Sequence, residues 1–311
     1  MILLRHHFRR YGYDRSSVSP FLCLVLIFLA WVFVCEAGAD ISRPDYMARL
    51  LDLAREKKLQ EEKYWRILLH YKKNLGGDES LVDDPRFFLS ADGKFNPGAE
   101  LEATIKAFFR ETEENADHPV CRFTARYAWL KEQLNIDESM LPVPRCEELD
   151  RIVRELRPGS ASLVFPTYYM NSPASMFGHS LINIETRKYE SKLLSHAVNY
   201  SAITDETNGL FFAIKGLFGF YKGYYSILPY YQKIQEYSDI SQRDIWEYQL
   251  NLSESEVKRL ITHLWELRNV HSDYYFFDEN CSYNLLFLLE SARPSLPGFL
   301  YGRCRLTPSR P

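Results

Sequence analysis

A cysteine and a histidine about one hundred residues apart are the strongest candidates for chemistry in this sequence. Cys281 lies in the segment Asp278-Glu279-Asn280-Cys281-Ser282, directly before an apolar run that predicts a buried helix. Unsatisfied N–H groups and the positive end of the helix dipole favour a thiolate in the first turn of such a helix. The carboxylates of Asp278 and Glu279 oppose a thiolate, so we expect that a histidine is needed to activate the thiol.

His179 is the histidine that best fits this role. It follows Phe177-Gly178 at the start of a predicted strand, where Gly178 lets another segment approach the backbone closely. An imidazole on a strand facing a thiol at a helix terminus is the arrangement of cysteine nucleophiles, with histidine acting as base and then as acid. The imidazole also needs an orienting partner. His196 and Asn199, on the next predicted strand, are the two candidates.

Plainer interpretations of these residues compete with the catalytic one. A cysteine at a helix start is more often a small buried hydrophobe, and a histidine near a strand is often simply hydrogen-bonded. His179, His196 and Cys281 are also residue types that bind zinc, but no close-spaced pair of ligands supports a metal site. We therefore expect neither a metal nor another cofactor.

The elements that would position these residues fall into two regions. Residues 40–158 show amphipathic helical patterns, including a helix opened by Asn96-Pro97, with Pro142, Pro144 and Pro158 between elements. Residues 159–300 contain short β-branched and aromatic runs that predict strands at 162–168, 179–184, 193–200, 224–228 and 245–250. Two helices follow, one opened by a capping box of Ser253 with Glu256 and one running from Asn280 to before Pro294. The predicted fold class is α+β.

The first 39 residues have the organisation of a secretory signal peptide. Four arginines precede an apolar run at residues 21–34, and Ala37-Gly38-Ala39 supplies the small residues of a cleavage site. The alternative is an uncleaved anchor, although this run is shorter than the roughly 20 residues of a full span. No comparable run follows residue 40, so the mature chain is expected to be soluble or peripheral. The full sequence has a formal net charge of −3, and the chain offers no basic field for nucleic acid.

Four cysteines remain beyond the predicted cleavage site. An even number of cysteines tends to pair in an oxidising compartment, and Cys121 and Cys146 enclose a loop short enough for two packed helices to close. We predict this disulfide, the alternative being two buried free thiols. Cys281 then stays free or pairs with Cys304.

Three segments of the chain resemble the Lnb N-terminal periplasmic domain family. They are Met170–Ser180, His196–Tyr200 and Asn280–Asn284, and the resemblance continues upstream through Phe87–Ser90 and Cys121–Phe123. That family resembles circularly permuted papain-like folds of the NlpC and lecithin retinol acyltransferase type. In those folds the histidine precedes the cysteine in sequence, as it does here. The resemblance implies an antiparallel-sheet domain with a buried helix that carries the cysteine.

The function implied by the resemblance is a thiol acyltransferase in the periplasm or at the outer face of the inner membrane. Family members transfer an acyl chain, through a cysteine thioester, to the amino-terminal cysteine of lipoproteins. By that resemblance Cys281 is the nucleophile, His179 the base and His196 the third polar residue, with Asn199 as the alternative. The expected partners are a lipid or lipoprotein substrate and a membrane surface. Lnb proteins continue into a membrane-associated part, whereas residues 301–311 form a polar tail, which indicates a truncation or a short soluble member.

The aromatic run from Gly209 to Tyr231 offers an apolar lining for an acyl chain. Gly216, Gly219 and Gly223 interrupt it and would let a flap open. The alternative is that these aromatic residues belong to an ordinary core. Two other functions stay open at this point. One is a cysteine amidase or peptidase of the same fold acting on cell-wall peptides, and the other is a non-catalytic envelope binding protein.

Overall fold

The computed structural model describes most of the chain beyond the predicted signal peptide. The described residues are 42–111, 117–142, 144–167, 179–187, 191–204, 206, 208–240 and 244–296. From Arg43 onward the chain forms one compact unit, distinct from residues 1–42. The predicted signal peptide, Cys304, the polar tail and residues 170–178 lie outside the described residues. Within the described part, no helix is both long and apolar enough to span a bilayer.

Helices dominate the first half of the described chain, as predicted. They are α2 (Arg43–Glu56), α3 (Lys63–Leu68), α4 (Pro97–Ala107), α5 (Pro119–Arg122), α6 (Thr124–Leu134) and α7 (Glu147–Leu156). The apolar pattern before residue 69 is broken because Lys58 adopts a left-handed conformation between α2 and α3. Asn96 caps α4 by accepting hydrogen bonds from the N–H groups of Gly98 and Ala99, and Pro97 occupies the first turn.

Six strands of the second half form one antiparallel sheet, which confirms the α+β class. They are β3 (Pro158–Pro166), β4 (Leu181–Thr186), β5 (His196–Ile203), β6 (Tyr221–Pro229), β7 (Ile245–Gln249) and β8 (His271–Tyr274). Their order in the sheet is β7-β3-β4-β5-β6-β8. In the pairing of β4 with β5, Leu181 lies opposite Asn199 and Ile184 lies opposite His196. This register decides which polar residue of β5 can reach the end of β4.

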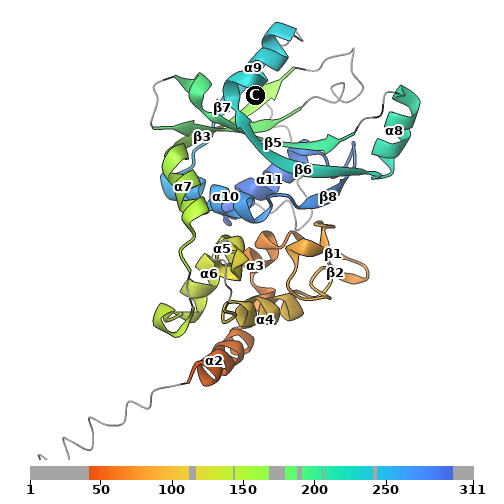
Figure 1. Ribbon diagram of the computed structural model, residues 1–311. Coiled ribbons are helices and arrows are strands. Elements are labelled where there is room, and N and C mark those ends of the chain that lie inside the picture. The colour runs from red at the N-terminus through yellow and green to blue at the C-terminus, as the bar shows by residue number, and fades with distance from the viewer. Residues whose placement is uncertain are drawn as a thin grey trace, which may run out of the picture. The chain divides into compact units, whose positions relative to one another are not determined.

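Two helices lie between the sheet and the N-terminal helices (Figure 1). They are α10 (Glu254–Glu266) and α11 (Cys281–Ala292). The predicted capping box opens α10, since the Ser253 hydroxyl accepts from the Glu256 N–H and the Glu256 carboxylate accepts from the Ser253 N–H. The main core cluster joins residues of the helical region, the sheet and both of these helices. On the other face of the sheet, α9 (Tyr230–Ile234) contributes Tyr230 to a smaller core.

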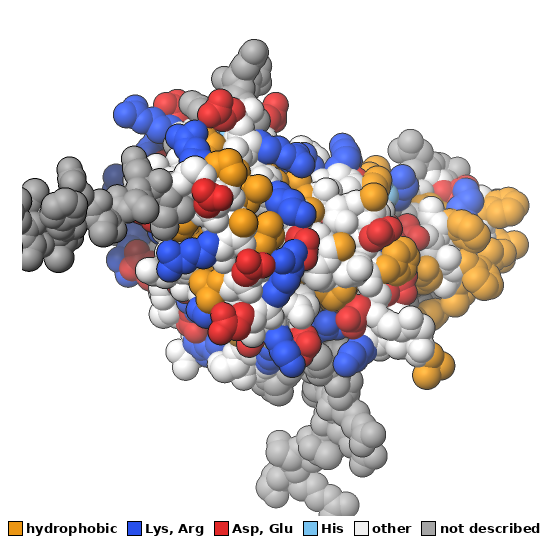
Figure 2. Space-filling model, turned by 90° about the horizontal axis from the view of Figure 1, so that it is seen from below, with side chains coloured by type: hydrophobic (Ala, Val, Ile, Leu, Met, Phe, Trp, Pro, Cys, Tyr) orange, Lys and Arg blue, Asp and Glu red, His pale blue; other side chains and the backbone are white. Residues whose placement is uncertain are grey.

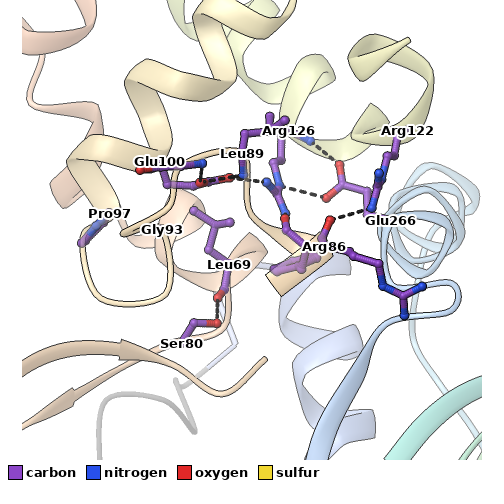
Figure 3. Close-up of polar contacts among 12 residues, drawn as sticks. Leu69, Ser80, Arg86, Leu89, Gly93, Pro97, Glu100, Arg122, Arg126 and Glu266 are labelled. Atoms are coloured by element: carbon purple, nitrogen blue, oxygen red, sulfur yellow. Dashed lines mark hydrogen bonds and ion pairs between the residues drawn. The ribbon is translucent and has the colours of Figure 1, made fainter. Parts of the chain in front are cut away.

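A fully buried arginine ties three helices together (Figure 3). Arg126 of α6 donates to Glu100 of α4 at 2.8 Å and to the carbonyl of Phe87 at 2.9 Å. The Arg126 backbone N–H also donates to Glu266 of α10 at 2.8 Å. The guanidinium lies 4.3 Å from the ring centroids of both Phe87 and Phe123. Two carboxylates and two aromatic faces thus compensate the burial of one positive charge.

The predicted disulfide is present. Cys121 of α5 bonds to Cys146, the residue before α7, with a Cα–Cα distance of 5.1 Å. Cys281 is the free cysteine among the described residues, and it is buried. The alternative of two free thiols at 121 and 146 is therefore wrong.

Candidate active site

Cys281 is the first residue of α11, and the polar residues around it fix that helix start. The Asn280 side chain accepts from the Tyr283 N–H, and its amide group donates to the Phe276 carbonyl. Asn284 donates to the carbonyls of Glu279 and Asn280. The side-chain amides thus hold the preceding loop and the first helical turn together, and only 5% of Cys281 is exposed.

His179 and Asn199 form the hydrogen bond that orients the imidazole. The distance between His179 Nε2 and Asn199 Oδ1 is 2.5 Å. The Asn199 amide nitrogen donates on its other side to Ser201 and Ser226, which leaves the carbonyl oxygen facing the histidine. Because that oxygen only accepts, Nε2 must carry the proton, and Nδ1 is left to interact with the thiol. Asn199 is nearly fully buried, so this orientation is held in a dry environment.

The segment carrying His179 contacts the first turn of α11. The hydroxyl groups of Ser180 and Ser282 lie 2.6 Å apart. Burial raises the pKa of the Cys281 thiol, but a hydrogen bond and charge interaction with His179, the Ser180 N–H and the Tyr274 hydroxyl outweigh it. The net result is a pKa lowered from 9.0 to about 7. Cys281 therefore carries substantial thiolate at neutral pH, as a nucleophile requires.

Tyr274 is a site residue that the sequence did not indicate. It ends the short strand β8, and its hydroxyl accepts a hydrogen bond of 3.3 Å from the Cys281 N–H. Burial and the neighbouring Cys281 charge both raise the pKa of Tyr274, so the hydroxyl keeps its proton. A buried phenol at this position can donate to negative charge on sulfur or on an adjacent oxygen.

His196 is not brought together with His179 and Cys281. It lies three residues before Asn199 on β5, and because side chains alternate along a strand, the two residues point to opposite faces of the sheet. His196 Nδ1 is buried and has no hydrogen-bond partner among the described residues. Burial lowers the pKa of His196, so its ring is neutral at pH 7. Of the two predicted candidates, Asn199 is the one in contact with His179.

Glu279 opposes the Cys281 thiolate less than its formal charge suggests. Burial raises the pKa of Glu279 to about 7. The Glu279 carboxylate also lies 4.0 Å from the ammonium group of Lys72 in β1 (Tyr71–Asn74). The positive charge of Lys72 and the partial protonation of Glu279 together reduce the negative potential at the Cys281 sulfur.

The glycines of the aromatic run are positions of close packing. A Cβ at Gly216 would lie 2.3 Å from the Phe276 ring, and one at Gly223 would lie 2.4 Å from the Tyr200 hydroxyl. Phe212 and Tyr221 are buried, whereas Phe211 and several others are exposed. The run therefore divides between core and surface. No group of three or more histidine, cysteine or acidic side chains in the described ranges is arranged to hold a metal ion.

Comparison with known families identifies the region that contains this site. Residues 148–301 match the family described as the Lnb N-terminal periplasmic domain. This part of the chain is an Lnb N-terminal periplasmic domain. It includes the six-stranded sheet and every residue that contacts Cys281 or His179 above, which confirms the resemblance. Residues 57–133 match a domain of unknown function, DUF7843.

The Lnb domain places the protein in the periplasm, as an envelope protein of the Lnb type. Neither a curated protein nor a solved structure matches the chain.

Proposed function

We propose that this protein is a periplasmic thiol acyltransferase in which Cys281 forms an acyl thioester. The observation that carries the proposal is the chain of contacts from Asn199 through His179 to Cys281, which gives a nucleophile, a base and an orienting residue. Residues 1–39 act as the export signal in this proposal. The acceptor is an amine, with the amino-terminal cysteine of a lipoprotein as the specific candidate.

The reaction proceeds in two steps. In the first, the Cys281 thiolate attacks the carbonyl carbon of an acyl ester, the ester bond breaks, and protonated His179 gives its proton to the departing alkoxide. In the second, the acceptor amine attacks the thioester, His179 takes the amine proton, and the thiolate leaves. In this proposal the Tyr274 hydroxyl, held by the hydrogen bond that it accepts from the Cys281 N–H, donates a hydrogen bond to the oxyanion of both intermediates.

Burial of the nucleophile favours transfer over hydrolysis. Because only 5% of Cys281 is exposed, bulk water has little access to a thioester formed there. An enclosed thioester can persist until an amine acceptor enters. A hydrolase acting on cell-wall peptides would instead need an open path for water to the same carbon.

The test follows the acyl group on Cys281 by peptide mass spectrometry. The purified protein is incubated with phosphatidylethanolamine vesicles, and a synthetic peptide with a diacylglyceryl cysteine at its amino terminus is then added. We expect an acyl adduct on the Cys281 peptide that disappears as N-acyl peptide forms. Cys281→Ala should abolish both signals, whereas Cys304→Ala should retain them.

Matched variants of Asn199 and His196 on β5 test which residue orients the His179 imidazole. Asn199→Ala should slow thioester formation about 100-fold, because the imidazole loses its orientation. His196→Ala, on the same strand but the opposite face, should change the rate less than threefold. An adduct that persists in Cys281→Ala, or release of free fatty acid with no N-acyl peptide, would contradict the acyltransferase proposal.

A further inference from the structure

Helix α8 (Gly209–Leu217) and the link that follows it present an unusual apolar surface. Six large side chains there are more than 40% exposed: Leu210, Phe211, Ile214, Leu217, Phe218 and Phe220. We refer to these six residues as the α8 face. Figure 2 shows hydrophobic side chains gathered at the right of the molecule, the side on which α8 lies in Figure 1.

The helix is anchored to the domain by its other side. Phe212 is buried against Phe276 and Tyr221, with ring centroids 5.0 and 5.5 Å away. Gly216 lets the Phe276 ring approach, and its carbonyl accepts a hydrogen bond from the Phe276 N–H. At 100° per residue, positions 210, 211, 214, 217 and 218 occupy an arc of roughly 120°, opposite Phe212 and Gly216. The domain therefore holds α8 firmly with this apolar arc turned outward.

A helix that is apolar on both sides requires a covering environment on the exposed side. Lys215, the one charged residue of α8, pairs with Glu206 at 2.7 Å and so adds no free charge to this surface. A stable interface between proteins takes about 20–30 residues from each partner and draws its binding energy mostly from Trp, Tyr and Arg. The α8 face has six residues and none of those three types. Phe and Leu on one side of a short helix instead fit shallow insertion into the acyl boundary of a bilayer.

We propose that the α8 face inserts into a lipid bilayer and docks the domain on the membrane surface. Docking at this face brings the bilayer next to the active-site loop, because Phe276 packs on α8 and its carbonyl accepts from Asn280, the residue before Cys281. The docking does not depend on the chemistry of Cys281. Delivery of a membrane acyl chain to Cys281 is the part that rests on the proposed function.

The absence of free charge on the α8 face makes the binding hydrophobic. We therefore expect binding to zwitterionic phosphatidylcholine vesicles that changes less than twofold between 50 and 500 mM salt, unlike binding through basic patches, which salt weakens. Replacing Leu210 and Leu217 by Ser should weaken vesicle partitioning about tenfold for each residue. Trp246→Ser and Tyr248→Ser are the matched controls, because these residues are similarly exposed but lie on β7 at the opposite edge of the sheet.

A tryptophan placed on α8 reports the insertion of this helix into the bilayer. It distinguishes that insertion from any membrane contact of the apolar run at residues 21–34. Phe211→Trp in the full chain is mixed with vesicles of bromine-labelled phosphatidylcholine, which quenches a Trp that enters the acyl region. We expect additional quenching relative to wild type for Phe211→Trp and none for Tyr248→Trp.

Two results would overturn the proposal. One is the absence of quenching specific to Phe211→Trp. The other is sedimentation showing that the wild type self-associates and that Leu217→Ser makes it monomeric, which would assign the α8 face to a second copy of the chain. Alkylation of Cys281 by iodoacetamide should be the same in all these variants. A failure of docking is thereby distinguished from a failure of the proposed chemistry.

Discussion

The pH dependence of Cys281 reactivity gives the sharpest test of the active-site geometry. The perturbation is His179→Ala, which removes both the hydrogen bond and the charge that lower the thiol pKa. What remains is burial, which raises the pKa and is the largest effect, opposed only by the Ser180 N–H and the Tyr274 hydroxyl, so the midpoint should rise from about 7 to the region of the ordinary value of 9.0. His196→Ala is the control, because it removes an imidazole from the same sheet without touching the thiol.

The expected change in rate is smaller than the change in thiolate population. With a midpoint near 7, about half of the thiol is ionised at pH 7, against about one part in a hundred for a midpoint of 9.0. That roughly 50-fold loss of thiolate is offset in part, because a thiolate of higher pKa is intrinsically about eightfold more nucleophilic. The net rate at pH 7 should therefore fall about sixfold. The midpoint of the pH profile, which should shift by about two units, is the decisive quantity.

The assay is alkylation by iodoacetamide between pH 5 and 10, with the Cys281 peptide quantified separately by mass spectrometry. We expect a wild-type rate that rises with a midpoint near 7, an unchanged midpoint in His196→Ala, and a midpoint near 9 in His179→Ala. A wild-type midpoint at or above 8.5, or an unshifted midpoint in His179→Ala, would refute the assignment of His179 as the activating residue.

Three predictions concern the stability of the scaffold. Arg126→Met leaves two buried carboxylates uncompensated and should lower the free energy of unfolding by about 3–5 kcal/mol, measured with urea at pH 7; a loss below 1 kcal/mol would contradict the role given to this ion pair. Replacing Cys121 and Cys146 by Ala, a separation of 25 residues, should cost about 3.5 kcal/mol, and reductant should then have no further effect on Tm. Burial lowers the pKa of both His70 and His263, so the unfolded chain gains protons that the folded chain excludes. Stability should therefore decline as pH falls below about 6.5, and urea titrations across pH should show a shallower decline for His263→Leu.

The elements with strong periodic patterns were predictable from the sequence, and the short ones were not. The capping box and the apolar spacing after Ser253 identified α10, and Pro97 marked the start of α4. The hairpin of β1 and β2 (Gly77–Ser80) was missed because its residues are mostly polar and show no alternation. The strand β8 was missed for a different reason. It has four residues, and it is a strand because it pairs with the edge of β6.

The proposed nucleophile and base could be inferred from residue type, but the residue that orients His179 could not. His196 and Asn199 lie on one predicted strand and are equally suitable by chemistry. Their separation of three places them on opposite faces, so only the register of β5 against β4 decides between them. Leu181 lies opposite Asn199, and His179 lies two residues before Leu181, which brings Asn199 into reach. Such a register depends on the packing of the whole sheet and carries no local signal.

The position of Cys281 depends on both regions of the chain, because both hold α11. From the helical region, the His70 ring stacks on Phe287 at 4.6 Å and the Tyr64 hydroxyl donates to the Ser291 carbonyl at 2.9 Å. From the sheet, the Tyr225 hydroxyl donates to the Asn284 carbonyl at 2.8 Å. Leu285, Leu288 and Leu289 of α11 belong to the main core cluster, and Phe287 packs with Ile67 in a smaller one. Removing the helical region would expose one side of the helix whose first residue is the proposed nucleophile. The N-terminal helices therefore support the candidate active site indirectly, by fixing the axis of α11 and with it the position of Cys281 relative to His179.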